Sequence, residues 1–239
     1  MPDFVLLIPV YNPPKGWEIQ FAKRYLNFRS ELQKDFPVWL INDGSTIPIQ
    51  ESLTYLEDTL GSDFNYLEYS PNKGKGAALK YAVSQVDASH YMFTDIDFPY
   101  TVASMVLTYK TLCREGGIAT GYREEAYYAD LSPFRTVLSK SLRVLNSFLL
   151  GLPVNDTQCG LKAFDADVRQ QLLTCETERF LIDLELLLSV SSRKLPITPV
   201  KVDLRDDTDF SKFNTSVLLR ELLSFLKIIW KYRIRKAFI

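Results

Sequence analysis

The sequence is poor in the residues on which several common kinds of site depend. It contains one histidine, His90, and three widely spaced cysteines, Cys113, Cys159 and Cys175, with no Cys-x-x-Cys pair. A histidine-rich metal site is therefore excluded, and a Ser-His-Asp triad has very few ways to form. We interpret His90 as structural, and the odd number of cysteines as reduced thiols in a cytosolic protein.

The chain also lacks an excess of charge and a long apolar run. Its 239 residues include 28 Lys and Arg against 29 Asp and Glu, so the net charge is −1. No global field favours nucleic acid, and the basic residues that matter are expected to act locally. No apolar run reaches the length of a membrane span, and the first residues lack the basic leader of a signal peptide. We therefore expect a protein that is made and retained inside the cell.

Few glycines and an apolar fraction of 46% indicate one large core, or a core with a small lobe. Apolar runs alternate with segments of helical spacing. Strands are expected at residues 4–10, 38–41, 64–69 and 91–97, and helices at 17–34, 48–60 and 77–86. This alternation predicts an α/β fold, with a mostly parallel sheet and helices on both faces. Ligands then bind beyond the carboxyl ends of the strands.

Two carboxylates, Asp95 and Asp97, end the apolar run that begins at Tyr91. Because side chains alternate along a strand, both are expected on one face, with Ile96 directed into the core. Two hard oxygen ligands at a strand end suit Mg²⁺ or Mn²⁺ that bridges to a phosphate-bearing substrate. An isolated Asp-x-Asp is more often a solvated turn or a helix cap, so this interpretation depends on the motifs around it.

Three polar clusters precede the carboxylate pair, at residues 9–12, 42–45 and 72–78. Tyr11 can stack on a base, Asp43 can accept from a base N–H, and Lys75 with the amides after Gly76 can face a phosphate. Each cluster alone is more often an ordinary turn or cap, but together they predict a nucleotide pocket. Neither a Walker A loop nor a Gly-x-Gly-x-x-Gly fingerprint is present. The candidate nucleotide-binding residues are Pro9, Tyr11, Asn12, Asp43, Lys75, Gly76 and Asp95.

Taken in order, residues 6–12, 41–45, 72–78 and 95–97 resemble the successive motifs of inverting family 2 glycosyltransferases with the A-type fold. Residues 155–164 and 179–187 are similar to the polyprenyl-phosphate branch, which includes the dolichyl-phosphate mannose and glucose synthases. The resemblance implies a Rossmann-like nucleotide-binding half and an acceptor half. The chain departs from the pattern at Pro99, where some members carry Gln as a further metal ligand, and in lacking the transmembrane helices of many members.

The resemblance also implies the chemistry. Metal held by Asp97, with Asp95 toward the ribose or the metal, offsets the charge that builds on the departing diphosphate. A hydroxyl acceptor needs a base, whereas a lipid phosphate is already anionic and needs cations to position it. The candidate cations are Arg123, Arg135 and Lys162, and the candidate acids on the acceptor side are Asp156, Asp183 and Glu185. For Arg135 the alternative is a solvated helix face.

The carboxyl-terminal residues predict a helix from Thr215 with a wide apolar face and a basic stripe, which is typical of a helix lying in a membrane interface. The alternatives are a helix packed on the domain or a dimer contact. We divide the chain into a catalytic domain, residues 1–213, and this helix, residues 214–239.

The leading hypothesis is a metal-dependent enzyme, peripheral on the cytoplasmic face of a membrane. It moves a hexose from a nucleotide sugar, of the UDP-glucose or GDP-mannose type, to a polyprenyl phosphate, and it binds no nucleic acid. A homo-oligomer or a separate membrane-protein partner stays possible. The alternatives are a family 2 transferase acting on a glycan or lipid hydroxyl, and a non-catalytic nucleotide-sugar-binding regulator.

Overall fold

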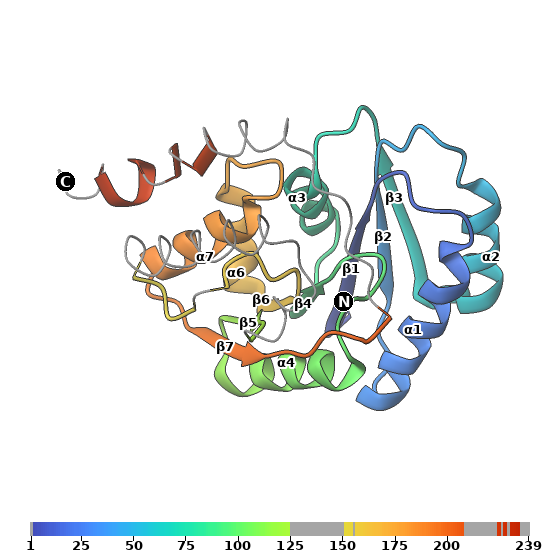
Figure 1. Ribbon diagram of the computed structural model, residues 1–239, viewed down its shortest axis with the longest axis horizontal. Coiled ribbons are helices and arrows are strands. Elements are labelled where there is room, and N and C mark those ends of the chain that lie inside the picture. The colour runs from blue at the N-terminus through green and yellow to red at the C-terminus, as the bar shows by residue number, and fades with distance from the viewer. Residues whose placement is uncertain are drawn as a thin grey trace.

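The computed structural model describes residues 2–124, 151–154, 156–207, 224–225, 227–228 and 230–234. A seven-stranded sheet, in the order β3-β2-β1-β4-β6-β5-β7, forms its centre (Figure 1). Strands β3, β2, β1 and β4 are parallel to one another, β6 is antiparallel to both β4 and β5, and β5 is parallel to β7. The strands are β1 (Phe4–Val10), β2 (Val38–Asp43), β3 (Phe64–Tyr69), β4 (His90–Phe93), β5 (Ile118–Tyr122), β6 (Lys162–Asp165) and β7 (Ile197–Lys201).

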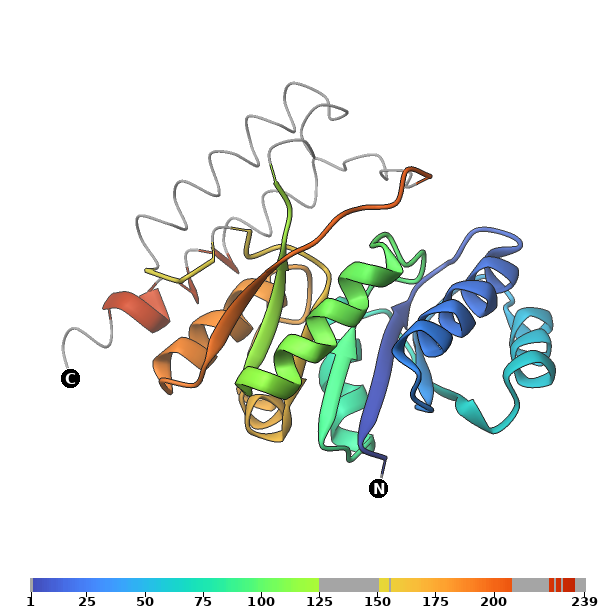
Figure 2. The same cartoon turned by 90° about the horizontal axis from the view of Figure 1, so that it is seen from below.

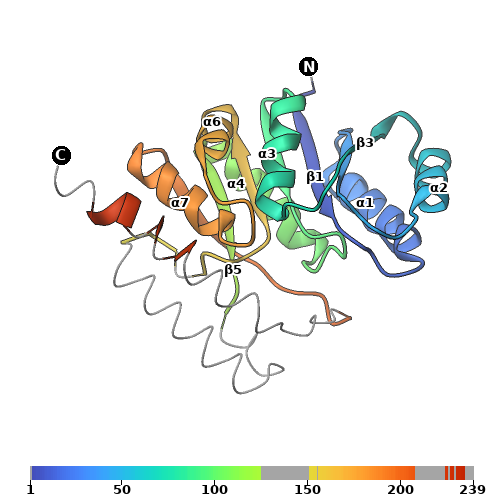
Figure 3. The same cartoon turned by 90° about the horizontal axis from the view of Figure 1, so that it is seen from above.

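Helices cover both faces of the sheet, as the alternating pattern predicted. Helices α1 (Trp17–Leu32), α2 (Gln50–Leu60) and α4 (Val102–Glu115) pack on one face, where Figure 2 shows α1 and α4 in front of the strands. Helices α3 (Lys75–Gln85), α6 (Ala166–Thr174) and α7 (Ile182–Ser192) pack on the other (Figure 3). Short turns of 3-10 and π-helix, η1 (Gly61–Asp63) and η3 (Trp230–Ile234), complete the described elements.

Each face of the sheet has its own apolar core. Alternate residues of β1 divide between them, so that Leu6 packs with the α1 side and Leu7 with the α3 side. This explains why the strand reads as a continuous apolar run: a strand covered on both faces has no solvated side. At about 25 cal/mol per Å² of buried apolar surface, these two layers supply the main stabilisation of the fold.

The expected elements are confirmed with shifts at their ends, and one expectation is wrong. Strand β4 stops at Phe93, so Asp95 and Asp97 do not belong to a strand. Phe93 is the last residue of β4 paired with either neighbour, opposite Leu7 and Lys162. Beyond it the chain turns, and the amide of Phe98 donates to the carbonyl of Asp95 at 2.9 Å.

The structure also bears on the expectations for the cysteines, for membrane-spanning helices and for the carboxyl-terminal residues. All three cysteines are free. Among the helices of the described residues, none has both the length and the apolar character to cross a bilayer. The boundary expected between residues 213 and 214, and most of the carboxyl-terminal helix, lie outside the described residues.

The turn after β2 depends on a glycine. Gly44 has φ +68°, and a Cβ atom placed there would lie 2.6 Å from the amide nitrogen of Asn72. Gly16, which precedes α1, has a similar φ of +75° but no atom within 4 Å of such a Cβ. A side chain at Gly16 would therefore introduce backbone strain alone, whereas a side chain at Gly44 would add a clash between two chain segments.

We expect Gly16→Ala to lower the free energy of unfolding by about 1 kcal/mol, the cost of a left-handed residue with a Cβ atom. Gly44→Ala should cost about 2 to 4 kcal/mol, because overpacking against the 71–72 backbone adds to the same strain. Urea denaturation followed by circular dichroism measures both variants. Equal losses of unfolding free energy in the two variants would show that the loop after β3 moves away from residue 44 at no cost in stability.

Candidate active site

Asp43, the last residue of β2, holds together the loop that follows β3. Its side chain is buried, and its two oxygens accept hydrogen bonds from Tyr69 Oη (2.6 Å), Asn72 Nδ2 (2.7 Å) and the amides of Lys73 (2.8 Å) and Gly74 (2.7 Å). Four protein donors occupy the usual acceptor capacity of a carboxylate. The structure therefore places Asp43 as the anchor of the 72–74 loop, whereas the sequence suggested an acceptor for a base N–H.

The Gly-rich segment after β3 also has a tertiary role that its sequence does not reveal. Helix α3 begins at Lys75, two residues earlier than expected. The amide of Ala77 donates to the carbonyl of Glu178 at 2.9 Å, and that of Ala78 donates to Gly74. These two amides, expected to face a phosphate, are already bonded within the protein. A Cβ on Gly76 would lie 2.7 Å from the carbonyl of Thr177, so the glycine permits this contact.

The side chain of Lys75 begins a chain of alternating charges. Its ammonium lies 3.1 Å from Asp95 Oδ1 and 3.6 Å from Asp183 Oδ2, and Asp183 Oδ1 accepts from the ammonium of Lys162 at 2.6 Å. Burial opposes the charge on Lys75, but the carboxylates of Asp183 and Asp95 raise the pKa of Lys75 above its ordinary value. Both ammonium groups also approach the ring of Phe93, at 5.3 and 5.8 Å.

These contacts change two expectations for the acceptor side, one for Lys162 and one for Asp183. Lys162 is fully buried and its ammonium also donates to the carbonyl of Cys159, so it does not face an acceptor as expected. Asp183 is 3% exposed, and each of its oxygens lies against a lysine. Both carboxylate oxygens of Asp183 are therefore engaged by protein cations, so the side chain is part of a buried ionic contact and not a free group facing the acceptor.

The turn that carries Asp95 and Asp97 is held by two arginines that the sequence analysis did not assign to the site. Arg24 of α1 donates to the carbonyl of Asp97 at 2.7 Å, and Arg205 donates to the carbonyls of Asp97 (3.1 Å) and Phe98 (2.7 Å). Both arginines also pair with Asp207. Arg24 follows Phe21 by three residues, at the edge of the buried stripe of α1, and that position was the only hint in the sequence.

The side chain of Asp97 is exposed at the edge of the sheet. Partial desolvation and then the neighbouring Asp95 carboxylate raise the pKa of Asp97, while Arg205 and Arg24 act in the opposite direction. A carboxylate crowded by another carboxylate gains most from a nearby cation. Asp97 is thus disposed to accept a cation on its solvent side.

On the other half of the sheet edge, the partly buried Arg123 pairs with the buried Asp156. Arg123 Nε and Nη2 donate to the two oxygens of Asp156 at 2.7 and 2.9 Å, and the Arg123 amide adds a third bond at 3.0 Å. Although burial opposes the charge, Asp156 raises the pKa of Arg123 above its ordinary value. The segment after Asp156 is held by Tyr100, whose hydroxyl oxygen accepts from the amide of Gly160 at 2.9 Å.

The remaining candidates separate into three groups. Tyr11 exposes 48% of its surface, while Asn12 binds the turn after β2 by accepting from the amide of Thr46 at 2.8 Å, and Pro9 lies within β1. Glu185 is buried, and its carboxylate accepts hydrogen bonds from backbone amides of the 176–177 segment. Arg135 lies outside the described residues.

Comparisons with known proteins identify what this chain is similar to. No family model matches the chain. The dolichyl-phosphate β-glucosyltransferase of Dictyostelium discoideum is 25% identical over 95% of this chain and 76% of its own length. The corresponding protein of Drosophila melanogaster is 30% identical over 84% of this chain and 66% of its own length. The chain thus spans about two thirds to three quarters of these relatives.

A solved structure shows the fold. Glucosyl-3-phosphoglycerate synthase from Mycobacterium tuberculosis, in complex with Mn²⁺, UDP and glucosyl-3-phosphoglycerate, is similar with a TM-score of 0.62 at 13% identity, over 97% of this chain and 80% of that one. The chain is a family 2 glycosyltransferase with the A-type fold. The fold and the enzyme class expected from the motifs are therefore confirmed. The comparisons speak against the non-catalytic alternative, because the relatives named here are transferases.

In this glycosyltransferase we expect Asp183→Asn to lower the free energy of unfolding by about 3 to 5 kcal/mol, because it leaves the fully buried Lys162 without its counter-charge. The double variant Asp183→Asn with Lys162→Met should regain part of that loss, since it removes the stranded ammonium. Urea denaturation of the two variants and the wild type provides the comparison. A loss below about 1 kcal/mol in the single variant would contradict a buried ionic role for Asp183.

Proposed function

We propose that this glycosyltransferase moves a hexose from a nucleotide sugar to a polyprenyl phosphate at a membrane surface, with a divalent metal at Asp95 and Asp97. The observation that carries the proposal is the Asp95–Asp97 turn beside Lys75 at the carboxyl edge of the parallel strands. Ligands of doubly wound sheets bind beyond that edge. The names of the relatives favour glucose as the sugar and dolichyl phosphate as the acceptor.

The two carboxylates fit a hard cation. Asp97 is exposed, and Asp95 uses one oxygen for Lys75 while its other oxygen lies where Gly160 has no side chain; a Cβ there would be 2.5 Å away. Within the described ranges, no group of three or more His, Cys, Asp or Glu side chains converges as a metal site. The diphosphate and water would complete the shell, which is usual for Mg²⁺ and Mn²⁺. Such a metal supplies charge that stabilises the departing diphosphate.

The protein's own residues position the donor. Tyr11 presents an exposed ring at the end of β1, suited to stacking on a base. The ammonium of Lys75, which remains charged, lies beside Asp95 and can bind a donor hydroxyl or phosphate oxygen next to the carboxylates. Arg24 and Arg205 hold the backbone of the turn, so the two carboxylates keep their separation when charge develops on the leaving group.

The position of Asp183 favours a phosphate acceptor over a hydroxyl acceptor. A hydroxyl must lose a proton to a base, and Asp183, a candidate for that role, is held by two lysines. A lipid phosphate is already anionic, and cations suffice to orient it. Arg123, fixed by Asp156, and Arg135 are the cations we assign to that task, with Asp156 as the residue that orients Arg123.

We also propose that the enzyme acts on the cytoplasmic face of a membrane, bound through its carboxyl-terminal residues. The support is the basic and apolar pattern of residues 214–239 together with three free cysteines, which suit a reducing compartment. Packing of this segment on a second copy of the chain, or on a membrane protein, is the alternative.

The direct test is an assay with a panel of nucleotide sugars and polyprenyl phosphate that scores release of the nucleoside diphosphate. In that assay Asp97→Asn should reduce transfer by several hundredfold, a loss of about 4 kcal/mol, because a main electrostatic stabiliser is removed. Asp58→Asn, at an exposed position on α2, serves as the control and should leave transfer unchanged. Full activity of Asp97→Asn, or of the wild type with excess chelator, would eliminate the metal mechanism.

The acceptor is tested separately. Arg135→Ala should raise the KM for polyprenyl phosphate roughly tenfold or more, because a charge-assisted bond to phosphate is lost, with little change in donor affinity. Arg114→Ala, which removes an exposed arginine paired with Glu115, is the matched control. A polyprenol without phosphate that is used equally well would instead support the hydroxyl acceptor.

A further inference from the structure

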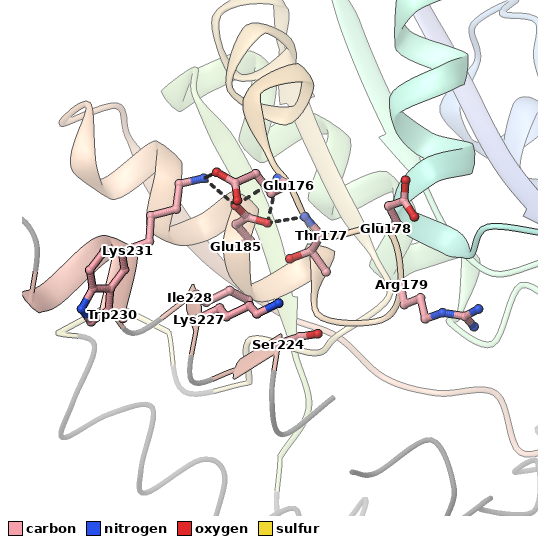
Figure 4. A pocket seen from close by; sticks show the side chains of 10 residues that line it. All are labelled: Glu176, Thr177, Glu178, Arg179, Glu185, Ser224, Lys227, Ile228, Trp230 and Lys231. Carbon is pink, nitrogen blue, oxygen red and sulfur yellow. Dashed lines mark hydrogen bonds and ion pairs between the residues drawn. The ribbon is translucent and has the colours of Figure 1, made fainter. Parts of the chain in front are cut away.

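A buried carboxylate on α7 joins the carboxyl-terminal segment to the catalytic domain. Glu185 accepts hydrogen bonds from the amides of Glu176 (3.1 Å) and Thr177 (2.7 Å) and from the ammonium of Lys231 (3.0 Å), which also pairs with Glu176 at 2.8 Å (Figure 4). Burial alone would raise the pKa of Glu185, but these hydrogen bonds lower it below its ordinary value. Glu185 therefore stays ionised with its side chain 1% exposed.

The backbone that Glu185 holds lies directly against the start of α3. The carbonyl of Thr177 would be 2.7 Å from a Cβ on Gly76, and the carbonyl of Glu178 would be 2.7 Å from a Cβ on Gly74. The carbonyl of Glu178 also accepts the amide of Ala77 at 2.9 Å. Close packing leaves no room for these segments to move independently. The position of residues 177–178 therefore sets the position of the first turn of α3.

That first turn carries Lys75, whose ammonium bonds to Asp95. A continuous path of short contacts thus runs from Lys231 through Glu185, residues 176–178 and the start of α3 to Asp95. Lys231 itself lines a cavity of about 630 Å³ between the 176–179 segment and the carboxyl-terminal segment, with Trp230 and Lys227 (Figure 4). It belongs to the segment expected to bind the membrane.

We infer that Lys231 is a positioning residue for donor binding: it neutralises Glu185, which seats residues 176–178 against α3 and so fixes Lys75 beside Asp95. The carboxyl-terminal segment then contributes to the donor site without touching the donor. This deepens the proposed function and rests on it for the identity of the donor. It assigns Glu185 to support of the donor side, where the sequence suggested an acid on the acceptor side.

Removing Lys231 leaves a buried carboxylate with fewer donors. In Lys231→Met the pKa of Glu185 should rise, its bonds to the 176–177 amides should weaken, and the first turn of α3 should gain freedom. The dissociation constant of the donor nucleotide should increase roughly three- to tenfold, the range found for residues that act through intermediates. Lys231→Arg keeps the charge and should restore the wild-type affinity to within about twofold.

The experiment uses the full chain in lipid-free buffer, so that membrane binding plays no part. Isothermal titration with UDP and with GDP, each with Mn²⁺, gives the affinity of the wild type, Lys231→Met, Lys231→Arg and Lys34→Met. Lys34 is the matched control, because its ammonium pairs with Asp3 at 2.6 Å next to the amino end of β1, and its loss should leave nucleotide affinity unchanged.

Native-state hydrogen exchange provides a second measurement that needs no nucleotide. The amides of Glu176, Thr177 and Ala77 should exchange roughly tenfold faster in Lys231→Met and not in Lys34→Met. Unchanged exchange at Ala77, or nucleotide affinity within twofold of the wild type, would overturn the inference. A wild type that binds neither nucleotide would overturn the proposed donor instead, while the exchange data still decide the role of Lys231.

Discussion

The buried carboxylate of Asp183 lies between two ammonium groups, and much of the site depends on that arrangement. Lys162, Asp183, Lys75 and Asp95 alternate in charge, so the group as a whole is neutral. Buried ions are tolerated only when they are paired and hydrogen-bonded, so each member holds its neighbours in place. The four residues come from β6, α7, α3 and the turn after β4. One ionic chain thus joins elements from the parallel part of the sheet to elements from its antiparallel part.

The same row of alternating charges helps to keep the Asp97 side chain at the solvent edge, because the turn that carries Asp97 is held at other atoms. Lys75 holds Asp95 from one side, and Arg24 and Arg205 hold the backbone of the turn through its carbonyls. The carboxylate of Asp97 is left exposed at the edge of the sheet, and its pKa is raised by partial desolvation and by the neighbouring Asp95 carboxylate. A fixed turn lowers the reorganisation that would otherwise accompany charge development on the leaving group.

Three further segments are held by side chains whose contacts could not be read from the local sequence. Asp43 anchors the 72–74 loop, Tyr100 supports the amide of Gly160, and Glu185 organises residues 176–177. Each is buried and accepts a hydrogen bond from at least one backbone amide, and the interior favours such pairing because an unpaired buried N–H costs free energy. This edge of the sheet therefore consists largely of loops, each held in place by a single buried side chain. Hydrogen bonds of this kind allow a loop to keep a defined geometry.

The apolar runs and the polar clusters of the sequence were enough to predict the layers of this fold and the sheet edge at which the clusters lie. Apolar runs such as Phe4–Val10 can only be strands covered on both faces, and polar clusters after successive strands must meet at one sheet edge. The pairing of the charges became apparent only from the contacts in the folded chain. Lys162 was expected to be an acceptor cation and is a buried partner of Asp183, while the only sequence signal for Arg24 was its position at the edge of the buried stripe of α1. Pairing depends on distances between residues 21 to 183 positions apart in the chain, and periodicity carries no information about those distances.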